Sequence, residues 1–340
     1  GALRIEESAH ELAVQNLATG FDPAVKRSDK RVLLGDSDVG SFSGALFGLA
    51  IARGTTTVVV RLVDLLGGGV GASQSFEHPP RVAGSDVMSR IRSDGEDGNQ
   101  LLRHVLLGYL AEAIRVLPCR PHEIYETVGA GNTTMRDLFF GLDVQSIGVK
   151  PFRSLVEFEY RAGKRTQTAI EIGGDQAGFP MNPRGRVYGL PLIGSHVGAD
   201  AAACLLAVSL PEEESAVIVM DIGTNTELVI GASERVLAAS CPAGPAFEGG
   251  GVTCGMPALE GAIEKVKLND SGPVTYGVIG DSPPEGICGS GLVDLLSELV
   301  RTGQMNDRGR LTDGPGAFDV DKERSIYVTE EDISNLAQTK

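Results

Sequence analysis

Two stretches of the chain, 49–63 and 217–231, consist of apolar runs on either side of a short polar turn, which predicts a β-hairpin in each. In both, the first run reaches a Gly-Thr pair and the chain returns as a second run. Aligned on their glycines, Gly54 matches Gly223, Thr55 matches Thr224 and Thr57 matches Thr226. The repeat predicts two related halves with a ligand cleft between them.

Elsewhere apolar positions recur at helical spacing. A helix is expected over 100–117, because the pattern stops before a proline, and a second over 199–208. The other expected elements are a short strand at 124–128, helices at 136–142 and 257–266, and a glycine turn that opens a helix within 286–296. Strands that alternate with helices favour an α/β architecture.

The chemistry of a Gly-Thr hairpin favours phosphate. Glycine has no Cβ, so backbone N–H groups can approach an anion closely, and Thr or Asn side chains add donors. An aspartate at the end of the first strand can hold Mg²⁺ through water. The second hairpin has Asp221 at this position, whereas the first has Ala52. The alternative is two ordinary β-hairpins, since Gly-Thr turns are common.

Composition narrows the class of protein. The chain has 340 residues, of which 42% are hydrophobic, and this indicates a globular protein. A net charge of −15 argues against binding nucleic acid. The five cysteines are scattered without CxxC spacing, so no zinc or iron–sulfur framework is expected, and they favour a reducing cytoplasm. No apolar run is long enough to predict a membrane span.

Five segments in order carry a family resemblance: 131–135, 194–200, 221–227, 242–251 and 286–296. Together they resemble the ATP-binding domain of the reductive activators of corrinoid proteins. This family belongs to the superfamily of acetate and sugar kinases, heat-shock chaperones and actin, abbreviated ASKHA. The resemblance implies duplicated ribonuclease-H-like lobes with ATP bound between them.

The resemblance also implies a domain organisation. The first lobe is expected at 45–205 and the second at 206–340. The family continues past the last segment with a further helix and an adenine-contacting loop, so the second lobe is expected to be incomplete at its C-terminus. Residues 1–44 are interpreted as a linker or the remnant of a preceding domain.

The implied activity is ATP-dependent electron transfer. Family members use ATP hydrolysis to return the corrinoid of a partner protein from cob(II) to the cob(I) state that accepts a methyl group. Their electrons pass through an N-terminal ferredoxin-like domain with a two-iron two-sulfur cluster. This chain has no such cysteine cluster, so it would depend on an electron donor in another domain or protein. The resemblance favours a homodimer.

Site residues are implied by position. Asp221 would hold Mg²⁺ or its water, and Asp200 would lie near the attacking water, so both are candidate catalytic residues. The implied nucleotide contacts are Gly54, Thr55, Thr56, Asn132, Gly223, Thr224, Asn225, Glu248, Gly249, Gly250, Gly289 and Ser290.

The first hairpin departs from the family pattern, because Ala52-Arg53 stands where the family has Asp-Ile. Alanine cannot hold a metal-bound water, and Arg53 could contact phosphate or point to solvent. Three functions therefore stay open: an ATPase coupled to electron transfer, a nucleotide-sensing or scaffold module that does not hydrolyse ATP, and a small-molecule kinase.

Two further positions have alternative interpretations. Asn132 could orient a phosphate or water, or it could cap the helix that follows. Asp86 and Arg90, one helical turn apart, could form a surface ion pair or part of the cleft wall.

Overall fold

The computed structural model describes residues 24–55, 57–77, 86–97, 100–208, 215–232, 235–269, 274–312 and 316–338, together with the backbone of 10–12. The chain divides into two compact units, which are described separately. Unit 1 comprises Gly1–Asp221 and Glu227–Ser240, and unit 2 comprises Ile222–Thr226 and Cys241–Lys340.

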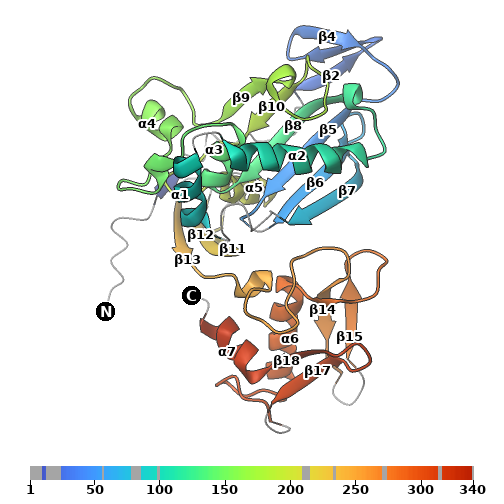
Figure 1. Ribbon diagram of the computed structural model, residues 1–340, viewed down its shortest axis with the longest axis vertical. Helices are drawn as coiled ribbons and strands as arrows, with labels where there is room; N and C mark the ends of the chain where they lie inside the picture. The colour runs from blue at the N-terminus through green and yellow to red at the C-terminus, as the bar shows by residue number, and fades with distance from the viewer. Residues whose placement is uncertain are drawn as a thin grey trace. The chain divides into compact units, whose positions relative to one another are not determined.

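The elements follow in chain order (Figure 1). The strands are β1 (His10–Leu12), β2 (Val25–Ser28), β3 (Arg31–Leu34), β4 (Ser37–Ser41), β5 (Phe47–Arg53), β6 (Thr57–Asp64), β7 (Val70–Glu77), β8 (Ile124–Gly131), β9 (Ile170–Gly173), β10 (Arg186–Gly189), β11 (Val217–Ile222), β12 (Asn225–Ala232), β13 (Arg235–Pro242), β14 (Ala262–Lys267), β15 (Thr275–Val278), β16 (Gly286–Ile287), β17 (Ala317–Asp321) and β18 (Ile326–Thr329). The α-helices are α1 (Val87–Asp97), α2 (Leu101–Arg115), α3 (Thr133–Phe139), α4 (Leu155–Arg161), α5 (Ala199–Ala207), α6 (Gly289–Arg301) and α7 (Glu330–Gln338).

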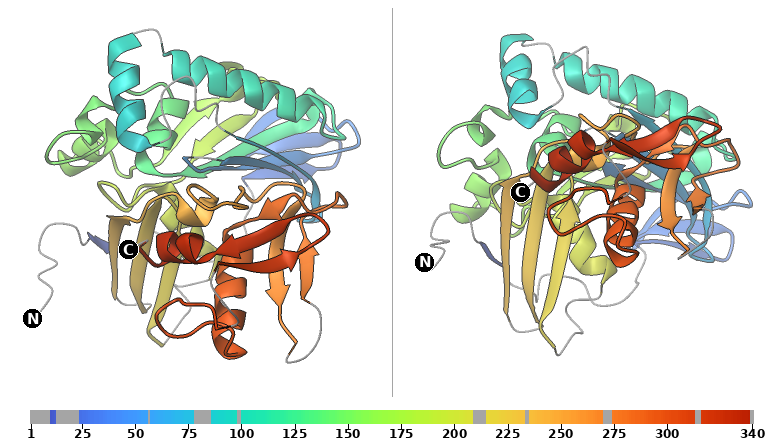
Figure 2. Two further views of the ribbon diagram at one scale, coloured as in Figure 1. Left: turned by 60° about the horizontal axis from the view of Figure 1, so that its bottom comes forward. Right: turned by 90° about the horizontal axis from the view of Figure 1, so that it is seen from below.

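Unit 1 is built on a six-stranded sheet in the order β7-β6-β5-β8-β10-β9. β5, β8 and β10 run parallel, while β6, β7 and β9 are antiparallel to their neighbours. Helix α2 packs on this sheet because Leu106, Leu110 and Ile114 recur on one helical face, and they join Leu49 and Ile51 of β5 in the core. Figure 2 shows α2 lying across the sheet.

A second sheet of unit 1 has the order β1-β13-β12-β11. Helix α5 contacts β8, and its Ala201 and Leu205 pack with Val229 of β12 and Val236 of β13. Helix α5 therefore joins the second sheet to the six-stranded sheet. Since Asp200 is in the first turn of α5, this packing decides where its carboxylate lies.

Strands β2, β3 and β4 form a small antiparallel sheet within the 1–44 segment. Val25, Val32 and Val39 form a core cluster with Leu46 and Tyr125. These strands therefore pack on the body of unit 1. The expected lobe boundaries, and the origin of this segment in a preceding domain, stay predictions.

Unit 2 contains a three-stranded sheet, β15-β14-β16, and the β17-β18 hairpin. Helix α6 lies along β14, because Leu292, Leu295 and Leu299 form one apolar face that packs with Ile263 and other core residues (Figure 2). Helix α7 contacts β18.

Most of the expected elements are confirmed, but the predicted helix at 257–266 is wrong, because this segment contains β14. β14 pairs antiparallel with β15 and parallel with β16, and these partners make the segment a strand. The expected helices 100–117 and 199–208 are α2 and α5. Of the helices that the structure describes, none combines the length and the apolar character needed to cross a bilayer.

Two element boundaries differ from expectation. Strand β8 extends beyond the expected 124–128 to Gly131, so Gly129 and Gly131 are paired strand residues. Helix α3 starts at Thr133, earlier than the expected 136, because Asn132 caps it. Both differences depend on partners outside the segment or on a local cap, which apolar spacing does not encode.

Candidate functional site

The turn of the first hairpin lies between β5 and β6 in unit 1. Gly54 N–H donates to the Thr57 carbonyl over 2.9 Å and closes the turn. Gly54 is exposed, whereas only 4% of Thr55 is accessible. Thr56, a predicted phosphate contact, lies outside the described residues. The turn therefore offers its exposed glycine to a ligand, while Thr55 anchors it to the unit.

Two side chains from other elements hold Thr55. The Asn132 side-chain amide donates to Thr55 Oγ1 over 3.1 Å, and Asn132 Oδ1 accepts from Met135 N–H over 2.9 Å. Asn132 therefore caps α3 and binds the first hairpin at the same time, so one of its two expected roles is confirmed. Arg90, from α1, donates to the Thr55 carbonyl and to Met135 Sδ.

Arg90 does not lie on the surface of the protein. Only 4% of Arg90 is exposed, so the expected surface pair with Asp86 is wrong. Asp86 instead accepts from Ser89 N–H over 2.9 Å in the first turn of α1. Helix α1 thus contributes a buried guanidinium to the back of the first hairpin.

Arg53 also differs from both of its expected orientations. Strand alternation turns Leu49, Ile51 and Arg53 to the core face of β5, so Arg53 is 1% exposed and Ala52 is exposed. The Arg53 guanidinium carbon lies 4.0 Å from the ring centroid of Phe139. Arg53 therefore neither points to solvent nor touches a phosphate on the exposed side of the turn. Period-two spacing from Leu49 could have predicted this burial.

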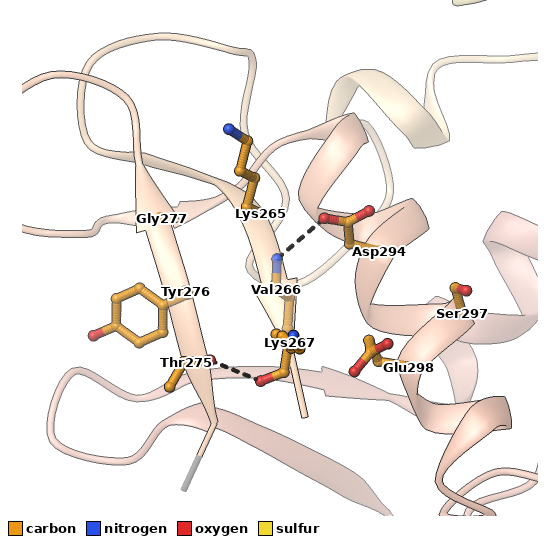
Figure 3. Close-up of a pocket in the computed structure, with 9 residues that line it drawn as sticks. All are labelled: Lys265, Val266, Lys267, Thr275, Tyr276, Gly277, Asp294, Ser297 and Glu298. Carbon is orange, nitrogen blue, oxygen red and sulfur yellow. Dashed lines mark hydrogen bonds between the residues drawn. The ribbon is translucent and has the colours of Figure 1, made fainter. Parts of the chain in front are cut away.

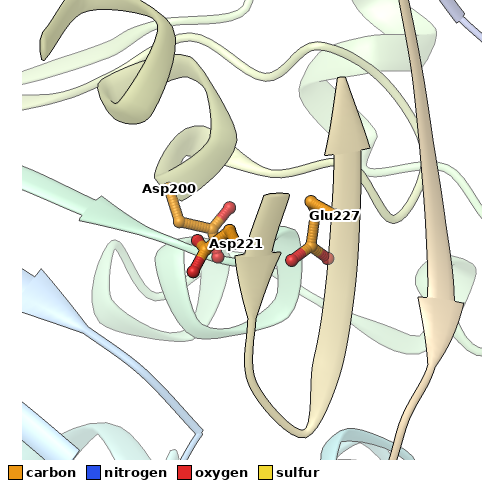
Figure 4. A group of neighbouring side chains, drawn as sticks. All are labelled: Asp200, Asp221 and Glu227. Atoms are coloured by element: carbon orange, nitrogen blue, oxygen red, sulfur yellow. The ribbon is translucent and has the colours of Figure 1, made fainter. Parts of the chain in front are cut away.

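Three carboxylates of unit 1 converge near the second hairpin. Asp200 belongs to α5, Asp221 to β11 and Glu227 to β12. One oxygen from each lies within 4.8 Å of the others, and Figure 4 shows the carboxyl groups pointing toward one another. Hard cations such as Mg²⁺ and Ca²⁺ prefer oxygen ligands, so the donor set fits such an ion.

The fold therefore brings the predicted residues Asp200 and Asp221 together. Glu227 belongs to the same group of carboxylates and was not predicted from the sequence. Alternation along β12 places Glu227 on the same face as buried Val229, which packs against α5. The sequence signal that could have identified Glu227 is a glutamate at a core-facing position of a strand.

Crowding and burial disfavour three negative charges at this point. Burial, followed by repulsion from Asp200, raises the pKa of Glu227 to about 8. Burial raises the pKa of Asp200 to about 6, with Asp221 adding to the effect, and burial also raises the pKa of Asp221. A bound divalent cation would favour the ionised forms of the three carboxylates and offset the repulsion between them.

The carboxylate group lies close to the first hairpin's anchor. A Cβ on Gly198 would lie 2.6 Å from Asn132 Cα and 2.7 Å from Asp200 Oδ1. Only glycine therefore allows the start of α5 to approach the start of α3 this closely. Asn132 bonds Thr55 and lies against Gly198, so it links the first hairpin to the carboxylates within unit 1.

Cys204 is a neighbour of the same group. Its thiol donates to Asp221 Oδ2 over 3.9 Å. Burial, and then the charges of Asp221 and Asp200, raise the pKa of Cys204 to about 11. The thiol is therefore protonated at neutral pH and acts as a hydrogen-bond donor rather than as a nucleophile.

The turn of the second hairpin belongs to unit 2. Thr224 Oγ1 donates to the Glu248 carboxylate, and the N–H groups of Ala243 and Gly244 donate to the Thr224 carbonyl over 3.1 and 3.0 Å. A Cβ on Gly223 would lie 3.6 Å from Glu248 Oε1. The structure thus brings the predicted residues Gly223, Thr224 and Glu248 together, with Asn225 opening β12 beside them.

The remaining predicted contacts lie around the same segment of unit 2. Gly249 has φ +89°, and a Cβ there would lie 2.5 Å from Met256 N. Gly250 packs against Pro245, and a Cβ on Gly289, at the start of α6, would lie 2.1 Å from the Phe247 carbonyl oxygen. Ser290 is exposed in the first turn of α6. Close backbone packing is thus the immediate reason for these glycines.

A groove of about 460 Å³ in unit 2 contains none of the predicted site residues (Figure 3). It lies over β14, β15 and α6 and includes Lys265, Lys267 and Tyr276. Val266 N–H donates to Asp294 Oδ2 over 3.3 Å, and this bond ties α6 to β14. This hydrogen bond therefore holds together two of the elements that form the groove.

Comparison with known proteins places these features in a family. Residues 47–213 match the model described as the RACo middle region. Residues 215–340 match the C-terminal domain of RACo, the ASKHA domain. The α/β fold and the ASKHA assignment are thereby confirmed.

Individual relatives agree with this result. The corrinoid activation enzyme RamQ of Eubacterium limosum is 37% identical over 276 residues, which are 79% of this chain and 44% of RamQ. The [Co(II) methylated amine-specific corrinoid protein] reductase of Methanosarcina barkeri is 23% identical over 332 residues, 86% of this chain and 57% of the reductase.

A solved structure of a reductive activator for a corrinoid, iron-sulfur protein superposes with a TM-score of 0.75 and 36% identity, and covers 88% of this chain and 50% of the activator. The chain spans about half the length of the relatives it matches. From the family models and these relatives, the chain belongs to the family of reductive activators of corrinoid proteins.

Proposed function

We propose that this chain is the ATP-binding module of a reductive activator that returns a corrinoid protein from cob(II) to cob(I). The observation that carries the proposal is the convergence of Asp200, Asp221 and Glu227 at the strand end that precedes the Gly223-Thr224 turn. Three carboxylates that converge in this way are suited to the magnesium ion of Mg-ATP.

In this proposal different residues bind the cation and the phosphates of Mg-ATP. Asp221 holds Mg²⁺ or its water, Glu227 and Asp200 complete the negative charge around the cation, and the Gly223 and Thr224 backbone meets phosphate oxygens. Asp200 also orients the attacking water. Magnesium supplies charge neutralisation for the phosphates when it is bound. Burial of the carboxylates supports the assignment, because it disfavours their ionisation without a cation.

A second candidate is nucleotide binding without hydrolysis. Exposed Ala52 occupies the position in the first hairpin that Asp221 occupies in the second, so the first hairpin offers no carboxylate there. ATP would then act by binding alone, and the resulting change of conformation would be what the corrinoid protein senses.

Calorimetric titration with Mg-ATP, combined with a phosphate-release assay, tests both candidates. We expect the wild-type chain to bind, Glu227→Gln and Asp221→Asn to weaken binding at least tenfold, and the exposed control Asp319→Asn to leave it unchanged. Hydrolysis by the wild type supports the ATPase. Hydrolysis only after Ala52→Asp supports binding without hydrolysis, and absence of binding contradicts both.

The partners belong to the same proposal. The names of the relatives support a corrinoid protein as the partner, and electrons would come from a separate donor domain or protein. We place the protein in the cytoplasm as a homodimer. The cob(I) absorbance of a corrinoid protein, recorded with a strong reductant with and without ATP, tests the activity. An ATP-independent yield of cob(I) would contradict it.

A further inference from the structure

The turn that precedes α5 has a strained backbone. Gly194 and Val197 exchange backbone hydrogen bonds of 3.1 and 2.9 Å across this turn. Between them Ser195 has φ +49°, in the left-handed region that residues other than glycine rarely adopt. Such a conformation persists where the surrounding structure holds it in place. Contacts from outside the turn are therefore expected at Ser195.

Side chains from two other helices of unit 1 bond the backbone of Ser195. Ser195 N–H donates to Glu157 Oε2 over 2.8 Å, and Thr133 Oγ1 donates to the Ser195 carbonyl over 2.6 Å. Glu157 belongs to α4 and Thr133 is the first residue of α3, and both are almost fully buried. The two bonds join segments that are 38 and 62 positions apart in the chain. Ser195 is thus held on both sides of its strained φ angle.

The bond to Ser195 accounts for the burial of Glu157. Its Oε1 lies 2.9 Å from Arg161 Nε and 3.1 Å from Arg153 Nε, at i,i+4 spacing in both directions. Ion pairs at this spacing form on exposed helix faces, so they do not require a buried carboxylate. Only 2% of Glu157 is exposed, and its second oxygen reaches inward to Ser195. A hydrogen bond to an ionised acceptor is stronger than one between neutral groups.

The held turn leads directly to Asp200. Val197 is 1% exposed and packs in the core beside α5. A Cβ on Gly198 would lie 2.8 Å from Thr133 N and 2.7 Å from Asp200 Oδ1, so this link has no spare room. A closely packed link transmits a shift rather than absorbing it. A movement of Ser195 would therefore displace the first turn of α5 and the Asp200 carboxylate with it.

We propose that Glu157 and Thr133 are positioning residues for the cation site, because they fix the Ser195 backbone and so set where α5 places the Asp200 carboxylate. The inference rests on the nucleotide binding proposed above, since the cation is that of Mg-ATP. Both residues act through the backbone and supply no ligand atom. Groups that orient metal ligands typically contribute about 10- to 100-fold to metal affinity.

Glu157→Gln is the variant that tests this role. An amide cannot satisfy both sets of partners, because its NH₂ group faces either Ser195 N–H or the two guanidinium groups, and a donor then meets a donor. Glu126→Gln is the matched control. Glu126 is also a buried glutamate of unit 1, and it accepts from Arg186 Nε over 2.8 Å within the six-stranded sheet. Chemical denaturation should show a loss of stability in both variants.

Mn²⁺ alone, followed by electron paramagnetic resonance, is the probe of the cation site. We expect the wild type to bind it, Glu157→Gln to weaken binding at least about tenfold, and Glu126→Gln to change the Kd by less than about twofold. An unchanged Kd in Glu157→Gln overturns the proposal. An equal loss of affinity in Glu126→Gln also overturns it, because general destabilisation would then explain both results.

Thr133→Val is the second variant, since it removes the hydroxyl donor and keeps the shape of the side chain. It should weaken Mn²⁺ binding by about three- to tenfold. If Glu157→Gln does not fold, Thr133→Val decides the matter, and an unchanged Kd in this variant overturns the proposal. Absence of Mn²⁺ binding by the wild type overturns it too, because Asp200 would then have no cation to meet.

Titration of the same proteins with Mg-ATP separates this inference from the proposed function. Binding of Mg-ATP by the wild type, with an equal Kd in Glu157→Gln, contradicts only the positioning role. Absence of Mg-ATP binding by the wild type contradicts the proposed function and this inference together. The expected result is binding by the wild type and by Glu126→Gln, and weaker binding by Glu157→Gln and Thr133→Val.

Discussion

The Asn132 side-chain amide donates to Thr55 Oγ1 over 3.1 Å and so joins the start of α3 to the turn of the first hairpin. The same side chain caps the helix through Met135 N–H. The first hairpin's turn is therefore held by a residue 77 positions away in the chain. Its shape depends on tertiary contacts as well as on its own glycine.

Asn132→Ala should lower both stability and nucleotide affinity. Loss of the cap and of the Thr55 contact is expected to cost about 1–3 kcal/mol of unfolding free energy. Ser154→Ala is the matched control, because Ser154 is a buried N-cap of α4 that bonds Val156 N–H. Chemical denaturation and Mg-ATP titration provide the measurements. Equal effects of the two variants on ATP affinity would refute a special role for Asn132.

Stability without divalent cations should fall as pH rises toward 8. The folded-state pKa of Glu227 is raised to about 8 from an ordinary value of 4.5, so between these values the folded protein holds a proton that the unfolded chain has released. Protonation thus stabilises the fold below about pH 4.5, and this contribution is lost as pH rises through 8. The loss is roughly 3–5 kcal/mol for Glu227.

Denaturation midpoints from pH 5 to pH 8.5 in EDTA measure this slope. Glu227→Gln should flatten the slope, since glutamine does not titrate, and saturating Mg²⁺ should restore stability at high pH in the wild type only. A slope that is identical in the variant would show that other groups cause it.

Gly129→Ala should destabilise unit 1 by about 1–3 kcal/mol, because the added methyl group would lie 2.5 Å from Arg53 Nη2 in a packed core. The effect should shrink in an Arg53→Met background, where the flexible thioether can move aside. A double-mutant cycle by thermal or chemical denaturation measures the coupling. Additive effects would mean that the methyl group clashes with something other than Arg53.

Asp332→Asn should loosen the start of α7 in unit 2. Asp332 Oδ1 accepts from Thr253 N–H over 2.8 Å, and Oδ2 accepts from Thr329 N–H over 2.9 Å. Burial opposes ionisation, but these donors outweigh it and hold the pKa of Asp332 below its ordinary value. Its stabilising effect is therefore present at neutral pH and is lost as pH falls below about 4.

The expected cost of Asp332→Asn is about 1–3 kcal/mol, because an amide cannot accept at both atoms. Hydrogen exchange of the α7 amides is the measurement. The exposed neighbour Glu331→Gln is the control and should leave exchange unchanged. Unchanged protection in both variants would contradict the capping role.

The local elements and the family could be predicted from the order of residues along the chain. Apolar runs ending at Gly54 and Gly223 predicted both hairpins, and helical spacing predicted α2 and α5, because these patterns depend on neighbouring residues along the chain. The ordered glycine-rich segments were sufficient to indicate the family.

Which side chains these elements bring together depends on how the elements pack. Glu227 joins Asp200 and Asp221 because α5 packs against the sheet of β12, and the Arg53 guanidinium meets the Phe139 ring because α3 packs beside β5. The segment 257–266 contains a strand because β15 and β16 provide hydrogen-bond partners. Such outcomes depend on contacts between residues distant in sequence, and local spacing does not specify which partner a strand or a side chain will meet.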